Sequence, residues 1–181
     1  DVVGSYMKIG NASAPTSSGS VTLAASVGGP RTLTLDGTSK GGQDDKGGEI
    51  RGIIGNGTGT GNVLSIVKNG TGSWILSSAN TFTGGVTLNA GMLIAGSNAA
   101  FGATAGTLTL AGGEVRNLGA LTFANPVNVT GGAMLTPANF LGVQFNQTYS
   151  GGWTSTGAPG AGPVVTIGEP SAATGVATVL I

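Results

Sequence analysis

Short apolar segments recur along the middle of this chain, and the turns between them are rich in Gly, Asn, Ser and Thr. Between residues 64 and 117 the apolar segments are 64–67, 74–76, 86–88, 92–94 and 108–110. Each segment is too short to bury a core alone, so neighbouring segments have to stack and share one. This requirement predicts an all-β strand solenoid, an architecture that more often displays a surface than catalyses a reaction.

The composition agrees with a globular, strand-rich chain. Of the 181 residues, 39% are hydrophobic and 8% are charged, whereas globular domains average about 25% charged residues. Branched aliphatic residues alternate with Thr, which is typical of strands and unlike a disordered chain. The 36 glycines follow no Gly-X-Y period, which excludes collagen.

Charge and hydropathy exclude two classes of partner. The formal net charge is zero, and the basic residues are scattered between Lys8 and Arg116 without forming the stripe that a nucleic-acid binder needs. No apolar run reaches the roughly 20 residues of a membrane-spanning helix. We therefore expect no nucleic-acid partner and no membrane span in this chain.

The spacing of the apolar segments continues on both sides of the regular part. Further strands are expected at residues 6–9, 20–23, 32–35, 49–54, 121–123, 127–129, 134–136, 143–145, 164–167 and 176–181. Residues 38–48 are the most charged stretch and are expected to project as a loop, and residues 150–162 are a Gly/Pro-rich excursion. We expect one solenoid domain over residues 1–181, most regular at 64–117, with about 20 residues per turn.

Residues 67–96, VKNGTGSWILSSANTFTGGVTLNAGMLIAG, resemble the autotransporter-associated β-strand repeat. That family's pattern opens with Lys-x-Gly-x-Gly, continues through an apolar strand and Ser-Gly-Ala-Asn-Thr-Tyr-Thr-Gly, and closes with Thr-x-Val-Asn-Ala-Gly-x-Leu. Ser78 stands where Gly is usual and Phe82 where Tyr is usual. The matching positions are Lys68, Gly70, Gly72, Leu76, Ser77, Ala79, Asn80, Thr81, Thr83, Gly84, Thr87, Asn89, Ala90, Gly91 and Leu93.

The resemblance implies a right-handed parallel β-helix from the exported passenger region of a large bacterial surface protein. It implies an extracellular or cell-surface location. It implies no particular activity, because such passengers include adhesins, enzymes and inert stalks.

The same stretch allows roles to be predicted for single residues. Asn80 and Asn89 are expected to satisfy backbone groups at corners through their side-chain amides. Phe82 is expected to pack against a neighbouring turn. The residues expected to fill the core are Ile75, Leu76, Val86, Leu88, Leu93 and Ile94.

The residues available for catalysis are few. Histidine and cysteine are absent, which excludes Ser-His-Asp and Cys-His nucleophiles and His-ligated metals. The only acidic cluster, Asp44, Asp45 and Glu49, is compatible with a calcium site or a sugar-cleaving pair. We favour a solvated loop, because Lys46 and Arg51 lie beside it and the spacing is not that of an EF-hand. We expect no catalytic residue, metal site or cofactor, and a non-enzymatic role.

Two aromatic residues are candidates for ligand contact. Tyr149 and Trp153 lie near or within the Gly-rich excursion, where an exposed ring would stack on a sugar. Trp74 lies within a strand segment and is better explained by packing. Surface glycans are therefore a possible ligand class.

The two ends of the sequence favour strand pairing. Residues 175–181 are uncharged and β-prone, and no amphipathic cap precedes or follows the strands. Either the chain is a piece of a longer passenger, or its terminal strands pair with copies of itself. We favour the second alternative, which predicts a non-enzymatic structural subunit of a bacterial surface or extracellular filament. The assembly residues would be Val2, Val3, Val176, Val179, Leu180 and Ile181.

The main alternative to a filament is an adhesive role. An adhesin module would bind glycans or a host protein through the loops at residues 38–48 and 150–162.

Overall fold

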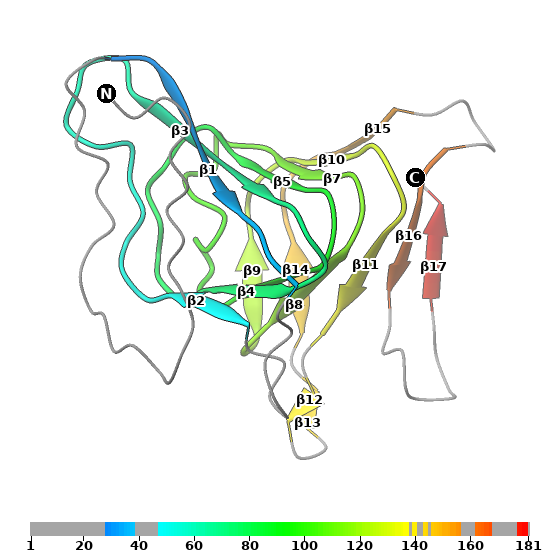
Figure 1. Cartoon of the computed structure of the whole chain (residues 1–181). Coiled ribbons are helices and arrows are strands. Elements are labelled where there is room, and N and C mark those ends of the chain that lie inside the picture. Colours follow the sequence, from blue (N-terminus) through cyan, green and yellow to red (C-terminus); the bar gives the residue numbers. More distant parts are fainter. Residues whose placement is uncertain are drawn as a thin grey trace.

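The computed structural model describes residues 28–38, 47–137, 139–140, 143–144, 146–156, 162–167 and 177–180. All the regular elements within these ranges are β-strands, and they coil into a solenoid (Figure 1). The expected all-β solenoid is confirmed. The strands are β1 (Pro30–Leu35), β2 (Gly48–Ile50), β3 (Val63–Lys68), β4 (Ser73–Leu76), β5 (Val86–Leu88), β6 (Met92–Ala95), β7 (Leu108–Leu110), β8 (Glu114–Asn117), β9 (Leu121–Phe123), β10 (Val127–Val129), β11 (Ala133–Thr136), β12 (Asn139–Phe140), β13 (Val143–Gln144), β14 (Gln147–Tyr149), β15 (Trp153–Ser155), β16 (Val164–Ile167) and β17 (Ala177–Leu180).

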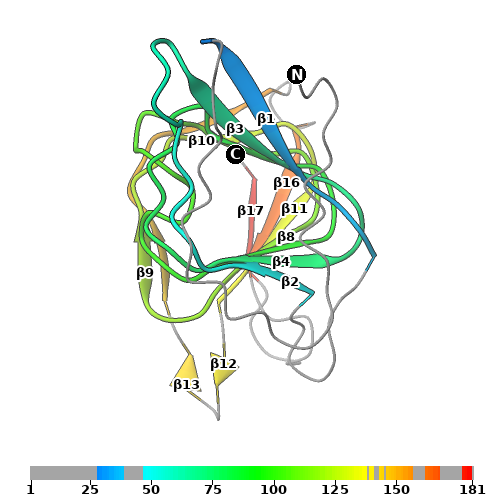
Figure 2. The same ribbon diagram turned by 60° about the vertical axis from the view of Figure 1, so that its left-hand side comes forward.

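Two long ladders form two sides of the coil. One is a six-stranded parallel sheet in the order β1-β3-β5-β7-β10-β15. The other is a seven-stranded sheet in the order β17-β16-β11-β8-β6-β4-β2, parallel throughout except for the antiparallel pair β16–β17. The third side carries the parallel pair β9–β14 and irregular backbone. Figure 2 shows these sides surrounding one interior.

The length of a turn varies along the solenoid. Residues bonded between successive middle turns are 19 apart for Ser65 and Gly84, and 20 apart for Asn69 and Asn89. The prediction of about 20 residues per turn is therefore confirmed in the middle. Turns at both ends are longer, with separations of 26 for Gly47 and Ser73 and 26 for Asn128 and Thr154.

Parallel pairing aligns interior side chains into columns, because equivalent positions lie above one another in successive strands. The columns of the six-stranded sheet are almost entirely buried. One column is Leu33, Ile66, Val86, Leu108, Val127 and Trp153. The next is Leu35, Lys68, Leu88, Leu110, Val129 and Ser155.

Aromatic rings fill the interior beside the third side. The ring centroids are 4.7 Å apart for Phe101 and Phe123, 5.3 Å for Phe123 and Tyr149, and 5.4 Å for Tyr149 and Trp153. Tilted pairs at such separations contribute about 0.5–1.5 kcal/mol each beyond their buried area. Phe82 is fully buried with its ring against Gly102 of the next turn, which confirms its predicted packing role.

Two of the predicted core residues are buried as expected but lie outside the interior cluster. Leu76, Val86, Leu88 and Leu93 belong to the interior cluster as expected, whereas Ile75 and Ile94 do not. Successive residues of a strand face opposite sides, so these two isoleucines face outward between inward-facing neighbours. Runs of three apolar residues in β4 and four in β6 hide this alternation in the sequence.

Several predicted strands need correction. Residues 143–145 do not continue the ladder, because β13 pairs with β12 in an antiparallel hairpin that projects from the coil (Figure 1). The strand expected at 49–54 ends at Ile50. The charged strand β8 and the strands β14 and β15 were not predicted. The segments at 6–9 and 20–23 lie outside the described residues.

Candidate functional site

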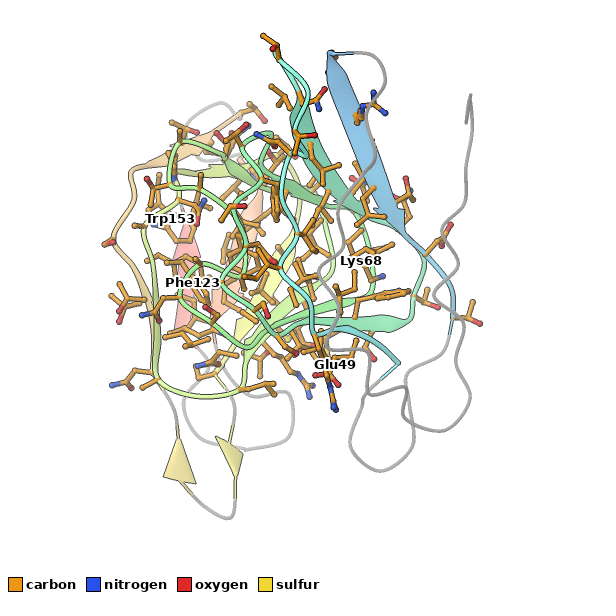
Figure 3. All side chains as sticks on the ribbon, turned by 90° about the vertical axis from the view of Figure 1, so that its left-hand side faces the viewer. Glu49, Lys68, Phe123 and Trp153 are labelled. Atoms are coloured by element: carbon orange, nitrogen blue, oxygen red, sulfur yellow. The ribbon has the colours of Figure 1, made fainter. Side chains whose placement is uncertain are left out.

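The most unusual group in the interior is the side chain of Lys68, which is fully buried (Figure 3). Its stem lies in the column between Leu35 and Leu88. Its ammonium reaches the corner between the two sheets, where Nζ donates to the carbonyl oxygens of Asn69, Gly70 (2.9 Å) and Ala90 (3.2 Å). The lysine therefore satisfies corner carbonyls that two successive turns leave open.

Burial changes the acidity of this lysine. Removal from water lowers the pKa of Lys68 from 10.5 to about 8, and the nearby Asp36 carboxylate opposes part of that decrease. The sequence matched Lys68 to a family motif, but we did not predict that its side chain is buried. Its position in the strand could have shown this, because Lys68 follows the buried Leu64 and Ile66 of β3 at the same spacing of two residues.

Asparagine side chains also fasten corners, at the Lys68 corner and elsewhere. The Asn80 amide accepts from Ile54 N at 2.9 Å and donates to Ala100 O at 2.7 Å, as predicted. The Asn89 amide instead donates to the side-chain oxygen of Asn69 at 2.8 Å. Asn125 donates to two carbonyl oxygens of the preceding turn. These bonds join successive turns where the ladder is interrupted.

A shallow groove of about 260 Å³ follows the outer side of the corner between the two sheets. Glu114, its one carboxylate, accepts from Arg116 Nε at 2.7 Å. The groove contains the thioethers of Met92 and Met134 and a carboxylate that is paired with an arginine. These groups are better suited to packing against a partner than to catalysis. The groove is lined by Thr71, Ser73, Gly91, Met92, Gly113, Glu114 and Met134.

The two residues considered for ligand contact are brought together in the structure. Tyr149 and Trp153 are half-buried, and their rings meet edge to face at the end of the aromatic column. Trp153 lies in β15 and pairs with Val127 rather than standing in a loop. Burial raises the pKa of Tyr149 well above its usual range. Contact with a ligand stays a prediction, now limited to the parts of these rings that remain exposed to solvent.

The acidic cluster is only partly described. Glu49 forms an ion pair with Arg51 at 2.9 Å and accepts from Ser77 Oγ at 2.6 Å. Asp44, Asp45 and Lys46 lie outside the described residues. Among the residues that are described, no three acidic, His or Cys side chains are placed to hold a metal ion.

The predicted assembly residues fall mostly outside the described ranges, including Val2, Val3, Val176 and Ile181. Val179 and Leu180 lie in β17, which pairs with β16 of the same chain. One edge of this strand is therefore already bonded within the molecule. Assembly through these residues stays a prediction. In the described part of the chain, no helix is long and apolar enough to cross a membrane.

Stacked parallel strands around a continuous core, with polar side chains fastening the corners, define a β-solenoid repeat protein. Residues 66–95 match the model of the passenger-associated transport repeat. Over 75 residues the chain is 48% identical to the adhesin BmaC autotransporter of Brucella suis biovar 1 (strain 1330). That alignment covers 41% of this chain and 2% of the relative, so the chain spans a small part of the relative's length. No solved structure matches.

The chain contains a passenger-associated transport repeat and is similar to an autotransporter adhesin, which supports an autotransporter passenger β-repeat protein. Its location is the bacterial cell surface or the extracellular space. The match covers β4, β5 and β6 and half of β3, where paired residues of successive turns are 19 or 20 positions apart. The family resemblance seen in the sequence is confirmed.

Proposed function

We propose that this chain is a rigid, non-enzymatic segment of a surface adhesin passenger, which holds more distal parts away from the cell. The observation that carries this proposal is the pair of ladders that continue from turn to turn around one core. Lys68 and the corner asparagines tie successive turns together where strands are absent. Such an arrangement resists bending because every turn is bonded to its neighbours.

The chemistry of the side chains supports a non-enzymatic role. The chain contains neither histidine nor cysteine. Glu49 and Glu114 each pair with an arginine. General acid–base catalysis and glycoside cleavage need carboxyl groups that face a substrate, and these two are engaged with neighbouring cations.

The test compares three bacterial strains. Their passenger contains the native segment, lacks it, or carries a Gly/Ser linker with the same number of residues. A rigid display segment predicts weaker adhesion in both altered strains, while beads coated with the isolated chain do not adhere. Beads that adhere, and lose adhesion on Trp153→Ala, would instead place a binding site in the segment itself and favour the adhesin module.

Self-assembly into a filament is the second proposal. The outer edges of β15 and β17 have no strand partner among the described residues, and such edges favour strand addition. Copies would join by adding strands, with residues 176–181 contributing. Electron microscopy of the native protein and of a variant lacking residues 176–181 tests this. Fibres in the native protein alone support the proposal, and fibres that persist in the deletion contradict the role of this strand.

A further inference from the structure

The sequence contains two Asn-Gly steps, Asn56-Gly57 between β2 and β3 and Asn69-Gly70 between β3 and β4. In such a step the glycine nitrogen can attack the side-chain carbonyl carbon of the asparagine, because glycine has no side chain to hinder the approach. The N–Cγ bond forms, the Cγ–Nδ2 bond breaks, and ammonia leaves with the proton of the backbone N–H. Water then opens the cyclic succinimide to aspartate or isoaspartate. The surroundings of each asparagine therefore decide its rate.

Lys68 activates the attacking nitrogen of Gly70. Its Nζ donates to the carbonyl oxygen of Asn69, which belongs to the same peptide group as that nitrogen. An amine that donates to three carbonyl oxygens carries all three protons, so this group is an ammonium. A cation at the carbonyl oxygen stabilises the anion that forms when the peptide N–H loses its proton. In the described part of the chain, Gly70 N donates to no acceptor and is free to attack.

The carbon under attack is activated from the next turn. Asn89 Nδ2 donates to Asn69 Oδ1 at 2.8 Å, and negative charge develops on this oxygen as the glycine nitrogen adds to Cγ. A donor fixed at such an oxygen stabilises the transition state. Asn69 keeps partial contact with solvent, so water reaches the succinimide. The stacking of two turns thus places a cation beside the nucleophile and a donor beside the electrophile.

The other Asn-Gly step is held differently. Asn56 Oδ1 accepts from Leu64 N at 2.9 Å and from Thr83 N at 3.1 Å. Asn56 Nδ2 donates to Thr83 Oγ1 at 2.9 Å. Both ends of this amide are therefore fastened, and the group cannot turn toward Gly57 N or release ammonia until these bonds break. Since a threonine follows the glycine in both steps, Asn56 is an internal reference for Asn69.

We propose that Asn69-Gly70 is a self-modification site, at which the Lys68 ammonium and the Asn89 amide promote cyclisation of Asn69 and its conversion to isoaspartate. Isoaspartate adds one carbon atom to the backbone of the β3–β4 corner. A Cβ on Gly91 of the next turn would already lie 2.5 Å from Gly70 O, so a longer backbone does not fit beneath that turn. The modified corner therefore separates from its neighbour. The inference does not depend on the proposed function.

Ageing of the full chain tests the proposal. The protein is incubated at neutral pH and physiological temperature, and chymotryptic peptides are analysed by mass spectrometry with electron-transfer fragmentation, which distinguishes isoaspartate from aspartate. Cleavage after Leu64 and Trp74 separates Asn69 from Asn56. In the folded chain Asn69 should be converted at least about tenfold faster than Asn56, since two hydrogen bonds favour its reaction. In denaturant the two rates should agree. Equal rates in the folded chain, or slower conversion of Asn69, overturn the proposal.

Two substitutions separate activation from loosening of the corner. Lys68→Met removes the ammonium, and Asn89→Ala removes the donor to Oδ1. Each also removes bonds that hold the corner, so a purely structural role predicts faster conversion of Asn69. The proposal predicts conversion about fivefold slower in each variant, with the rate at Asn56 unchanged as the sign that the chain stays folded. Thr122→Ala, on the exposed face of β9, is the control and should alter neither rate. An unchanged or higher rate at Asn69 in either variant overturns the proposal.

Discussion

The corner between the two sheets is built differently in the middle of the solenoid and toward its C-terminal end. Before β6, Gly91 has a φ of +69°, and a Cβ there would collide with Gly72 O and lie 2.7 Å from Lys68 Nζ. The equivalent position before Met134 is Ala133, a buried core residue of β11. Equivalent positions of successive turns thus differ: there is no room for a methyl group at Gly91, whereas the methyl group of Ala133 packs in the core.

This difference teaches that each turn is constrained by the turns beside it. In the middle, short turns stack closely and Lys68 occupies the corner, which leaves no room for a side chain. Toward the C-terminal end, the chain spends more residues per turn, including the projecting hairpin β12–β13. The ladders continue through both regions because insertions occur at corners and leave the columns intact.

The largest expected effect is the loss of an aromatic ring from the interior. Phe123→Ala should lower the free energy of unfolding by about 3–5 kcal/mol, because it removes a fully buried ring that contacts two others. Thr122→Ala, on the exposed face of the same strand, should change it by less than about 0.5 kcal/mol. Denaturant unfolding measures both. Similar losses of unfolding free energy in the two variants would contradict the interior position of Phe123.

Gly91→Ala tests the tight corner directly. It should cost about 2–3 kcal/mol, because the methyl group meets backbone oxygens and the backbone has a positive φ. Gly132→Ala, where a Cβ would meet only Val164 O at 3.8 Å, is the matched control and should be nearly neutral. The comparison fails if the two variants unfold at the same denaturant concentration.

Lys68→Met tests whether the ammonium fastens the corner. The substitution keeps a stem of similar shape but leaves the carbonyls of Asn69, Gly70 and Ala90 without their donor. We expect a loss of about 1–2 kcal/mol at pH 7, since unpaired buried acceptors are costly. Hydrogen exchange should rise first at the β3–β4 and β5–β6 corners. Unchanged stability would show that the ammonium contributes nothing net.

The dependence of the free energy of unfolding on pH has a defined sign. Between pH 8 and 10.5 the unfolded chain keeps a proton on Lys68 that the folded chain has released, so the free energy of unfolding should rise with pH. Tyr149 acts oppositely above pH 10, because its pKa is raised in the folded state. Denaturant unfolding measured between pH 7.5 and 9.5 separates the contribution of Lys68 from that of Tyr149. A rise of equal size in Lys68→Met would assign the effect to another group.

The smallest effect is expected from removing the β12–β13 hairpin. Replacing residues 139–144 by a two-residue turn should change the free energy of unfolding by less than about 1 kcal/mol, because the hairpin lies outside both ladders. Thermal unfolding of the shortened and native chains provides the measurement. A large loss would mean that the hairpin supports the solenoid.

Sequence patterns predicted the fold where apolar and polar residues alternate between clear turns. Strands β5, β7 and β16 have the predicted bounds. Strand β8 was missed because Glu114 and Arg116 alternate with Val115 and Asn117, which hides a half-buried strand. Trp153 was placed in a loop because Gly and Pro surround its three-residue strand.

The candidate site was less predictable than the fold. A lysine in a family motif does not reveal which carbonyls it will meet, since these come from two turns that only stacking brings together. The outward position of Ile75 and Ile94 was also hidden, because a buried apolar side chain suits either face of the sheet. Contacts between turns depend on register, which single segments do not encode.

The short spacing between bonded turns has a consequence for how the protein is made. Each middle turn finds its partner only 19–22 residues away along the chain, so closing it costs little chain entropy. The chain can therefore fold by adding one turn to the last without waiting for distant segments. The open edge of the last folded turn is the template on which the next turn pairs.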